Sequence, residues 1–315
     1  MERYTLPASD GISLAAYRWL PVGDCQRVLQ ISHGMAEHMA RYDRLARQLN
    51  AHGIAVYGHD HRGHGQTAPA GTLGDFGPKA DWGQVVADVL QVAGYARQQH
   101  PNRPIILLGH SMGSFIARAA LQRAPTAYAG AVVSATGFRQ APFARLMSHL
   151  ASWVGRRRGE DKPSTFLSKL AFGSFNLRFL PNRTAFDWLS RDAAEVDRYI
   201  ADPLCGFDCS PRLWYQLLTG IAALEQDEKR PGVLPPAMPL WLIAGTHDPV
   251  SLGGLGMRQL AQRYQQAGAG QVSVSLYPAG RHELFNDNNR DEVSADLLRW
   301  LTTYWPKEAE KAAGE

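Results

Sequence analysis

The sequence predicts an α/β fold, in which a mostly parallel sheet of eight strands is covered by helices on both faces and interrupted by a helical insertion. Two observations predict it. Short apolar runs alternate with helical patterns along most of the 315 residues, and this rhythm stops between about residues 140 and 231. Strands that are apolar throughout indicate a sheet buried on both faces. The length suits one full domain with a sizeable insertion as well as it suits two domains.

The expected strands and helices follow one another in a regular order. The first twenty residues alternate around the turn dipeptide Asp10-Gly11 and indicate a hairpin. The strands expected after it are Val28–Ile31, Ile54–Tyr57, Ile105–Leu108, Ala131–Val133, Leu240–Ile243 and Val272–Leu276. The expected helices are Arg41–Ala51, Asp81–Gln99, Ser111–Arg123, Met257–Gln266 and Val293–Tyr304. In the first two helices apolar residues recur at helical spacing, which gives each a face to pack on the sheet.

The segment between the expected strands Ala131–Val133 and Leu240–Ile243 does not follow the α/β pattern. It contains several amphipathic helical patterns and many aromatic residues, and it ends in the linker-like run Pro231–Pro236. We therefore expect residues 1–139 and 232–306 to form the core, residues 140–231 to form a helical cap inserted between two strands, and residues 307–315 to form a flexible tail.

Composition excludes several classes of protein. With 45% apolar and 20% charged residues, the chain is expected to fold, and its net charge of +4 is too small to indicate nucleic-acid binding. The three cysteines indicate thiols of a reducing compartment rather than a disulfide framework. Cys205 and Cys209 have no second Cys/His pair at metal spacing nearby, which argues against zinc. Without an N-terminal apolar segment or a long apolar stretch, the expected location is cytoplasmic.

The most basic run, Arg156–Arg158, lies in the expected cap and is followed at once by Glu160 and Asp161. A solvated helix end is the favoured interpretation. A contact with anionic lipid headgroups is the alternative, and it would place the protein at the inner face of a membrane. The sequence gives no indication of the oligomeric state.

A G-x-S-x-G motif, Gly109–Gly113, follows an apolar strand and begins a helix. A sharp strand-to-helix turn needs small residues on both sides of the serine, and it pushes Ser111 outward while the helix start supplies backbone N–H groups. A plain Gly/Ser turn is the alternative, and the strand and helix around the motif argue against it. Ser111 is therefore the candidate nucleophile.

A serine nucleophile needs a base, and the base needs an acid that orients it. Asp248 lies just past the next-to-last strand, and His282 lies just past the last strand. Both positions are at carboxyl ends of strands, where open α/β sheets bind ligands. Asp248 could instead be a turn former before proline, and His282 a surface residue. His247 also adjoins the acid, but its place before Asp248 suits packing better than base catalysis.

Acyl transfer also needs donors for the developing oxyanion. The backbone N–H of Met112, directly after Ser111, is one candidate. The other is the N–H of Met35, in the loop after the strand Val28–Ile31. His33 in the same loop is expected to brace the loop.

The segment His59–Thr67 places three histidines and an aspartate within six residues, so it could hold a metal ion. Asp60, Arg62 and His64 alternate there with other residues in a crossing from strand to loop. A structural turn with an internal salt bridge and hydrogen bonds explains them better. We expect no metal and no cofactor.

Together these motifs make the chain resemble the α/β-hydrolase superfamily and, within it, the monoacylglycerol lipase and lysophospholipase-like branch (serine aminopeptidase S33, hydrolase 4). The matching segments are His33–His38 with Arg41-Tyr42, Asp60–Gly65, Gly109–Gly113, Gly245–Val250 and Gly280–Glu283. The resemblance implies Ser111 as nucleophile, Asp248 as acid, His282 as base and Met35 and Met112 as oxyanion donors. The cap matches only weakly, through Asp202–Phe207.

The leading hypothesis is a cofactor-free serine carboxylic-ester hydrolase that forms an acyl-enzyme. The aromatic cap favours a small-molecule substrate with a fatty acyl chain, such as a monoacylglycerol or lysophospholipid. A thioesterase or an aminopeptidase on the same triad is the alternative. An aminopeptidase needs acidic cap residues to bind a free amine, and the residues to check are Asp192, Glu195, Asp197 and Asp202. A non-catalytic lipid-binding protein is a third hypothesis, which the complete triad argues against.

Overall fold

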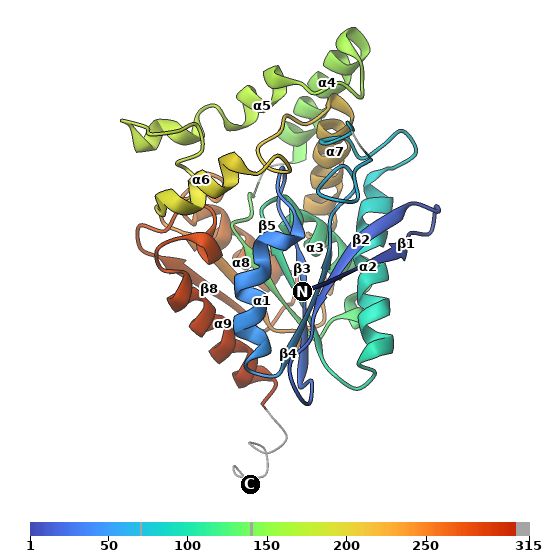
Figure 1. The fold of residues 1–315 in the computed structure, drawn as a ribbon, viewed down its shortest axis with the longest axis vertical. Helices are drawn as coiled ribbons and strands as arrows, with labels where there is room; N and C mark the ends of the chain where they lie inside the picture. The colour runs from blue at the N-terminus through green and yellow to red at the C-terminus, as the bar shows by residue number, and fades with distance from the viewer. Residues whose placement is uncertain (70, 139–140, 307–315) are drawn as a thin grey trace.

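The computed structural model describes residues 1–69, 71–138 and 141–306. The expected boundary at residues 139 and 140 and the expected tail at 307–315 lie outside the described residues. The described chain forms one sheet of eight strands (Figure 1) in the order β1-β2-β4-β3-β5-β6-β7-β8. The strands are β1 (Glu2–Pro7), β2 (Ser13–Trp19), β3 (Arg27–Ser32), β4 (Ile54–His59), β5 (Ile105–His110), β6 (Gly130–Ser134), β7 (Leu240–Gly245) and β8 (Val272–Tyr277).

The sheet is antiparallel at one edge and parallel elsewhere. β1 and β2 form the expected N-terminal hairpin, and β2 also pairs antiparallel with β4. From β4 to β8 every neighbouring pair is parallel. The predicted mostly parallel, eight-stranded sheet is therefore confirmed. The parallel strands have their carboxyl ends on the same side of the molecule. The loops after β3, β5, β7 and β8 therefore come together there.

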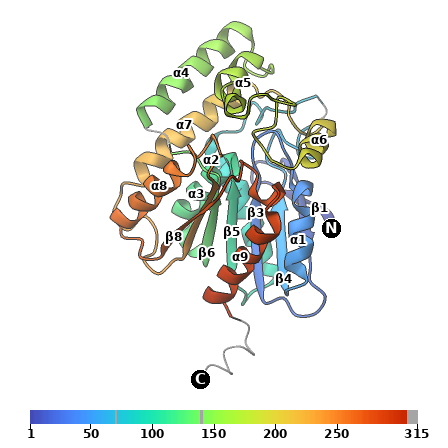
Figure 2. The same ribbon diagram turned by 90° about the vertical axis from the view of Figure 1, so that its left-hand side faces the viewer.

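Helices cover both faces of the sheet (Figure 2). Successive side chains of a strand point to opposite faces. Leu29, Ile31 and Ile106 therefore pack with α1 (Asp43–Asn50) and α9 (Arg290–Tyr304). On the other face, the alternate residues of the same strands pack with α2 (Trp82–Gln99), α3 (Met112–Arg123) and α8 (Leu255–Gln266).

The observed helix boundaries differ from the expected ones by a few residues, for local reasons. Asp81 lies outside α2 because its side chain accepts the Gln84 N–H as an N-cap. The helix expected at Arg41–Ala51 begins as a 3-10 turn, η1 (Met39–Tyr42), and becomes an α-helix at Asp43, the first residue of α1. Asp60 accepts the N–H of Met39 at 2.8 Å, which ties the start of this turn to the loop after β4.

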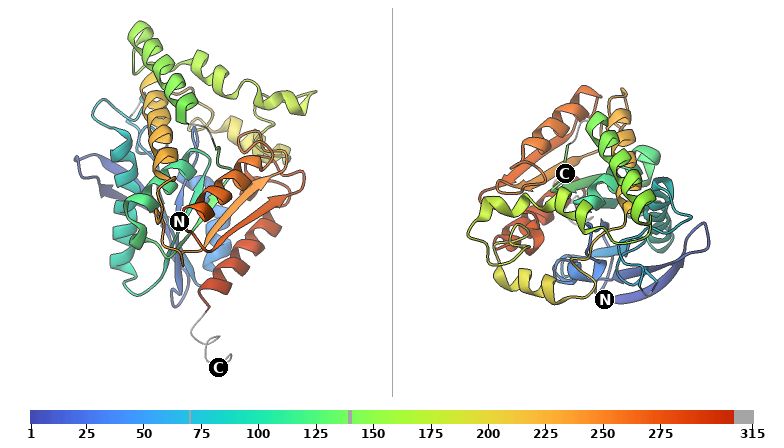
Figure 3. Two further views of the ribbon diagram at one scale, coloured as in Figure 1. Left: turned by 180° about the vertical axis from the view of Figure 1, so that it is seen from behind. Right: turned by 90° about the horizontal axis from the view of Figure 1, so that it is seen from above.

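The described part of the chain between β6 and β7 contains helices joined by irregular segments, and no strand. It comprises α4 (Ala141–Arg158), α5 (Thr165–Phe172), η3 (Phe175–Phe179), α6 (Ala193–Ala201) and α7 (Pro211–Asp227), here called the cap helices. Ser164, Asp192 and Ser210 are side-chain N-caps of α5, α6 and α7. α4 packs along α7, and the cap helices lie over one end of the molecule (Figure 3). Among the described residues no helix combines the length and apolar character needed to cross a bilayer.

Candidate active site

Ser111 occupies a sharp turn between β5 and α3. Its backbone has φ 51° and ψ −120°, a conformation that L-residues rarely adopt outside constrained sites. The flanking glycines make the turn possible. A Cβ atom at Gly113 would lie 2.1 Å from the carbonyl oxygen of Ser32, and one at Gly109 would lie 2.6 Å from the Cβ of Ala117. The turn therefore requires glycine at both places, as the motif predicts.

The structure brings His282 and Asp248 together. Nδ1 of His282 and Oδ1 of Asp248 are 2.8 Å apart, and both side chains are buried. The Asp248 carboxylate also accepts the backbone N–H groups of Val250, at 3.0 Å, and Ser251, at 3.1 Å. Burial alone would raise the pKa of Asp248, but the charge of His282 and these hydrogen bonds outweigh it and lower the pKa. Asp248 is therefore an ionised partner for the imidazole.

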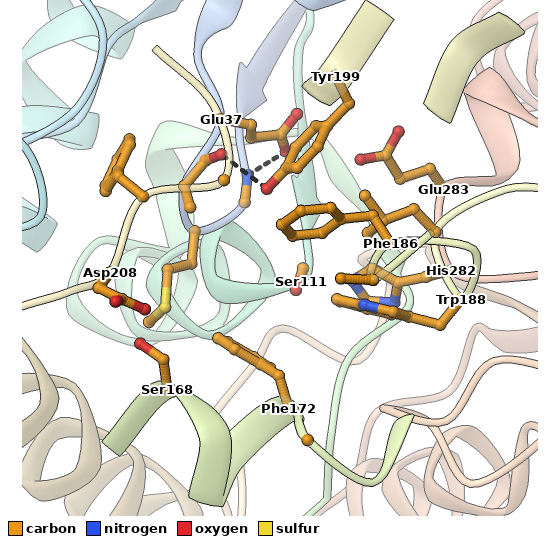
Figure 4. Close-up of a pocket in the computed structure, with 18 of the residues that line it drawn as sticks. Glu37, Ser111, Ser168, Phe172, Phe186, Trp188, Tyr199, Asp208, His282 and Glu283 are labelled. Atoms are coloured by element: carbon orange, nitrogen blue, oxygen red, sulfur yellow. Dashed lines mark hydrogen bonds between the residues drawn. The ribbon is translucent and has the colours of Figure 1, made fainter. Parts of the chain in front are cut away.

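Ser111 and His282 line the same pocket (Figure 4), which Glu37, Lys169 and Asp208 also line. Among the residues that the structure describes, no hydrogen bond joins Ser111 Oγ to His282. Apo active sites often have long or unaligned catalytic hydrogen bonds that tighten when substrate binds. The arrangement is therefore compatible with a proton transfer between the two side chains.

Aromatic rings fix the position of His282. The ring centroids of His110 and Trp188 lie 4.8 and 4.9 Å from its own. Burial, together with the nearby His282, lowers the pKa of His110 to about 3, so His110 stays neutral. Trp188 belongs to the segment between η3 and α6, and Leu189 next to it accepts the N–H of Glu283 at 2.8 Å. The sequence motifs predict no role for His110 or Trp188 in positioning the imidazole.

His247 is not part of this arrangement. It lines neither of the two pockets described at this site, and its N–H donates to the carbonyl of Gly280 at 2.9 Å. That contact joins the loops after β7 and β8. The preference for His282 over His247 as the partner of Asp248 therefore agrees with the geometry.

The two backbone N–H groups of Met35 and Met112 have no protein acceptor within residues 1–69, 71–138 and 141–306. Both residues line a pocket together with Ser111. Next to Met35, Ala36 adopts a positive φ of 54°. His33 braces this loop, because Nδ1 lies 2.8 Å from the Gly34 carbonyl oxygen and Nε2 accepts the His61 N–H at 2.9 Å. We call residues 33–38 the oxyanion loop.

The cap side of the molecule binds the oxyanion loop directly. The carbonyl oxygen of Ala36 accepts the hydroxyl of Tyr199 at 2.9 Å and the N–H of Gly206 at 3.0 Å. Both donors belong to α6 or to the segment after it. The conformation of the oxyanion loop is therefore coupled to the position of this part of the chain.

A buried ionic network joins the oxyanion loop to the His282 loop. Arg41 binds Glu37 at 2.8 Å and binds Glu283 through both nitrogens, at 2.7 and 2.6 Å. Burial raises the pKa of Glu37. Burial would also raise the pKa of Glu283, but the charge and hydrogen bonds of Arg41 lower it to about 2. One signal for this network was present in the sequence. Glu37 and Arg41 follow His33-Gly34, and Glu283 follows His282.

Two pockets meet at Ser111. One has a volume of about 270 Å³ and includes the charged residues Lys169 and Asp208. We call it the polar pocket after these two side chains, although apolar and aromatic residues such as Phe186, Trp188 and Phe207 make up most of its lining. The other has a volume of about 460 Å³ and is lined mainly by apolar residues of α4, α5 and α7. We call it the apolar pocket. Met35, Ser111 and Phe172 line both, so a ligand that fills both pockets passes Ser111.

The histidine-rich segment after β4 forms a structural turn in its described part. Arg62 binds Asp88 and Asp10 through hydrogen bonds of 2.6 to 3.0 Å. Asp60 accepts hydrogen bonds from the Tyr17 hydroxyl and from the N–H of Met39 and of Gln66. The expected internal salt bridge is therefore wrong: Arg62 pairs with Asp10 and Asp88, which lie outside the segment, and Asp60 is held by the Tyr17 hydroxyl and backbone N–H groups instead.

The fold and this site define a serine hydrolase with the α/β-hydrolase fold. Residues 23–289 match the family described as serine aminopeptidase, S33 (Hydrolase_4), and the chain belongs to this family. Two relatives match over most of the chain. The chain is 29% identical to a monoacylglycerol lipase of Mycolicibacterium smegmatis over 297 residues, and this match covers 93% of the chain and 94% of the relative. It is 30% identical over 304 residues to the monoglyceride lipase of Homo sapiens, with 93% and 88% covered.

A solved structure shows the same architecture. The thermostable carboxyl esterase from Bacillus coagulans superimposes with a TM-score of 0.87 at 26% identity, and the match covers 96% of this chain and 98% of the esterase. The resemblance inferred from the sequence motifs is therefore confirmed at the level of the family.

Proposed function

We propose that the protein hydrolyses fatty acyl esters of the monoacylglycerol type through an acyl-enzyme on Ser111. The observation that supports this proposal best is the meeting of the two pockets at Ser111, one apolar and one partly polar. Such a pair suits an ester with a long apolar acyl chain and a small polar alcohol. The two relatives, which are lipases of this substrate class by name, support the same conclusion.

The proposed reaction begins when Ser111 Oγ attacks the ester carbonyl and His282 takes its proton. The backbone N–H groups of Met35 and Met112 stabilise the negative charge on the carbonyl oxygen. The C–O bond to the alcohol then breaks, and His282 returns the proton to the leaving alcohol. A water that His282 deprotonates next cleaves the acyl-enzyme. Asp248 keeps the imidazole in the required tautomer and compensates its positive charge throughout.

The acyl chain is assigned to the apolar pocket and the alcohol to the polar pocket. Phe115, Leu217 and Ile221 line the first and offer no hydrogen-bonding side chain. Lys169 and Asp208 line the second and can bind hydroxyl groups. A lysophospholipid would bring a phosphate to Lys169. Monoacylglycerol is preferred because Asp208, Glu37 and Glu283 also line this pocket.

An aminopeptidase activity has less support. The four acidic residues that the sequence singles out for binding a free amine are engaged elsewhere: Asp192 pairs with Arg290, Glu195 with Arg44 and Arg198, Asp197 with Arg183, and Asp202 with His38. None of the four lines the polar or the apolar pocket. A thioesterase would use the same triad, and only a comparison of substrates separates it from an ester hydrolase.

The test is a substrate series with the full chain, comprising monoacylglycerols of increasing chain length, lysophospholipids, acyl-thioesters and aminoacyl p-nitroanilides. We expect the highest kcat/KM for monoacylglycerols with long acyl chains. Ser111→Ala should reduce the rate to background, and Asp248→Asn should reduce kcat by about 10⁴-fold because the imidazole takes the wrong tautomer.

A fluorophosphonate probe provides the control, because it labels an activated serine whatever the acyl group. Labelling of the wild type but not of Ser111→Ala is expected. Wild-type ester hydrolysis by Ser111→Ala would overturn the mechanism. Normal probe labelling with a preference for thioesters or aminoacyl amides would overturn only the substrate class.

We further propose that residues 140–231 act as a substrate-selecting cap and that the cap touches a membrane surface at the inner face, from the cytoplasmic side. The apolar residues Leu146, Trp153, Phe166 and Leu170 are each about half or more exposed on α4 and α5. Leu170 also lines the apolar pocket. A lipid surface that covered these residues would deliver substrate directly to that pocket.

A further inference from the structure

A group of three metal-binding side chains lies outside the proposed triad, within the part of the chain that the structure describes. One ligand atom each from His38, Asp202 and Cys205 lies within 4.8 Å of the other two. His38 ends the oxyanion loop, whereas Asp202 and Cys205 follow α6. The sequence spacing could not reveal this group, because His38 lies 164 residues before Asp202.

Hydrogen bonds already hold Asp202 and the two segments that carry the three side chains. Leu204 N–H donates to Oδ1 of Asp202 at 2.9 Å, which leaves Oδ2 directed at Nε2 of His38 at a distance of 2.8 Å. The Gly206 N–H, next to Cys205, donates to Ala36 in the oxyanion loop. The two segments are therefore held against each other before any ligand binds, and one oxygen of Asp202 is oriented as metal-bound carboxylates are.

We propose that His38, Asp202 and Cys205 form a binding site for a divalent zinc-class cation. Imidazole nitrogen, carboxylate oxygen and thiolate sulfur are the three ligand types of protein zinc sites. In a tetrahedral zinc site neighbouring ligand atoms are about 3.3–3.8 Å apart. His38 Nε2 and Asp202 Oδ2, now 2.8 Å apart, would therefore have to separate by about 0.5 Å, and Cys205 Sγ would have to approach them by up to about 1 Å. A water would complete the coordination. Cys205 and Asp202 are only partly buried, so the cation can reach them.

The charge around the site is compatible with a cation. Arg41 lies near Cys205, but its charge is already compensated by Glu37 and Glu283. Asp202 and a Cys205 thiolate would together bring two negative charges to a divalent cation. The site therefore becomes neutral when it is filled.

Binding requires a deprotonated thiol. Burial raises the pKa of Cys205, so the cation must displace the Sγ–H proton, which leaves to solvent. The imidazole must offer Nε2 as an unprotonated nitrogen, with its remaining proton on Nδ1. The titratable or charged groups that face Cys205 are His38, Asp202, Arg41, Glu37 and Glu283. Because binding releases the thiol proton, affinity should rise with pH.

The experiment uses the full untagged chain and Co²⁺, whose bond to a thiolate gives a near-ultraviolet charge-transfer band, followed by competition with Zn²⁺. The band is expected in the wild type and absent in Cys205→Ser. Zn²⁺ should also raise the Tm of the wild type more than that of Cys205→Ser. The apparent Kd should increase at least about tenfold in the variant, since even loss of a partner outside the direct ligands costs that much.

Cys25→Ser is the matched control, because Cys25 is also a half-buried free thiol but precedes β3, whereas His38 follows the other end of that strand. It should keep the band. Asp202→Asn is the second variant and should weaken binding while leaving the thiol intact. A band of equal intensity in Cys205→Ser, or no band in the wild type at mildly alkaline pH, would overturn the proposal. The readout does not depend on ester hydrolysis, so it stands apart from the proposed function.

Discussion

At the scale of single residues, two non-glycine residues of the site adopt left-handed φ angles, Ser111 at 51° and Ala36 at 54°. Such conformations persist only where the surroundings determine them. For Ser111 the determinant is the tight contact of Gly113 with β3. For Ala36 it is the pair of hydrogen bonds that its carbonyl accepts from Tyr199 and Gly206. Tyr199 is thus a positioning residue for the neighbouring Met35 N–H.

Tyr199→Phe tests this role, because it keeps the ring and removes the hydroxyl. A single hydrogen bond is worth about 0.5–1.5 kcal/mol, so kcat should fall about two- to tenfold. KM should change little, because the oxyanion forms only in the transition state. Steady-state kinetics with one long-chain and one short-chain ester provide the measurement, and the factor should be the same for both.

Tyr128→Phe is a suitable control, since Tyr128 also has a buried hydroxyl, which donates to Gln30 away from the site. It should lower the Tm without changing kcat. If Tyr199→Phe lowered only the Tm as well, the hydroxyl would have a purely structural role.

At the scale of elements, the ion pairs of Arg41 join three parts of the chain: the oxyanion loop, η1 and the loop after β8. Glu283 makes the larger contribution, because it binds Arg41 through two hydrogen bonds. Removing one partner of a buried pair leaves the other poorly compensated. One guanidinium group therefore fixes the position of the loop that contains His282 relative to the loop that contains Met35.

Glu283→Gln should lower the free energy of unfolding at neutral pH by about 1.5–3 kcal/mol, the usual value of a hydrogen bond to a charged group. The pKa of Glu283 in the folded chain is about 2, below its ordinary 4.5. The stabilisation is therefore complete above pH 4.5 and is lost as the pH falls toward 2. The difference between wild type and variant should shrink over that range, which urea unfolding at several pH values can measure.

Glu2→Gln, which removes the exposed pair with Arg18, serves as the surface control and should change the stability little at any pH. A Glu283→Gln deficit that stayed constant between neutral and acidic pH would contradict the assignment of the acid dependence to Glu283.

The same elements show what sequence patterns can and cannot predict. Apolar runs predicted β3 to β7, because strands buried on both faces have few alternative explanations. The edge strand β8 was also predicted, although it is only partly buried. The G-x-S-x-G motif predicted the turn at Ser111 because its glycines are required locally. The contact of Tyr199 with Ala36 and that of Trp188 with His282 could not be predicted. They depend on how segments far apart in the chain pack, and neither residue lies in a motif.

At the scale of the whole molecule, the cap helices present an apolar face away from the sheet. On α4, Leu146 and Trp153 are seven residues apart and therefore lie on the same side of the helix. They are 66% and 51% exposed, and Arg157 stacks over the Trp153 ring. The exposed run Arg156–Arg158 ends the same helix. Apolar side chains beside a basic helix end are the combination expected of a helix that lies on an anionic lipid surface.

The combined variant Leu146→Ser and Trp153→Ser should reduce co-sedimentation with anionic phosphatidylglycerol vesicles at least about tenfold, since each apolar side chain contributes about 1.5 kcal/mol or more when fully buried. Replacing Arg156–Arg158 by glutamine should reduce it only for anionic vesicles, and added salt should have the same effect. Val22→Ser is the control. Val22 is fully exposed and follows β2, whose last residue pairs with the beginning of β4, at the end of the sheet away from the cap helices. If none of the cap substitutions changed the amount of protein that sediments with vesicles, contact through this face would be excluded. Hydrolysis of a water-soluble short-chain ester should be unchanged in every variant, which would show that the catalytic site is intact.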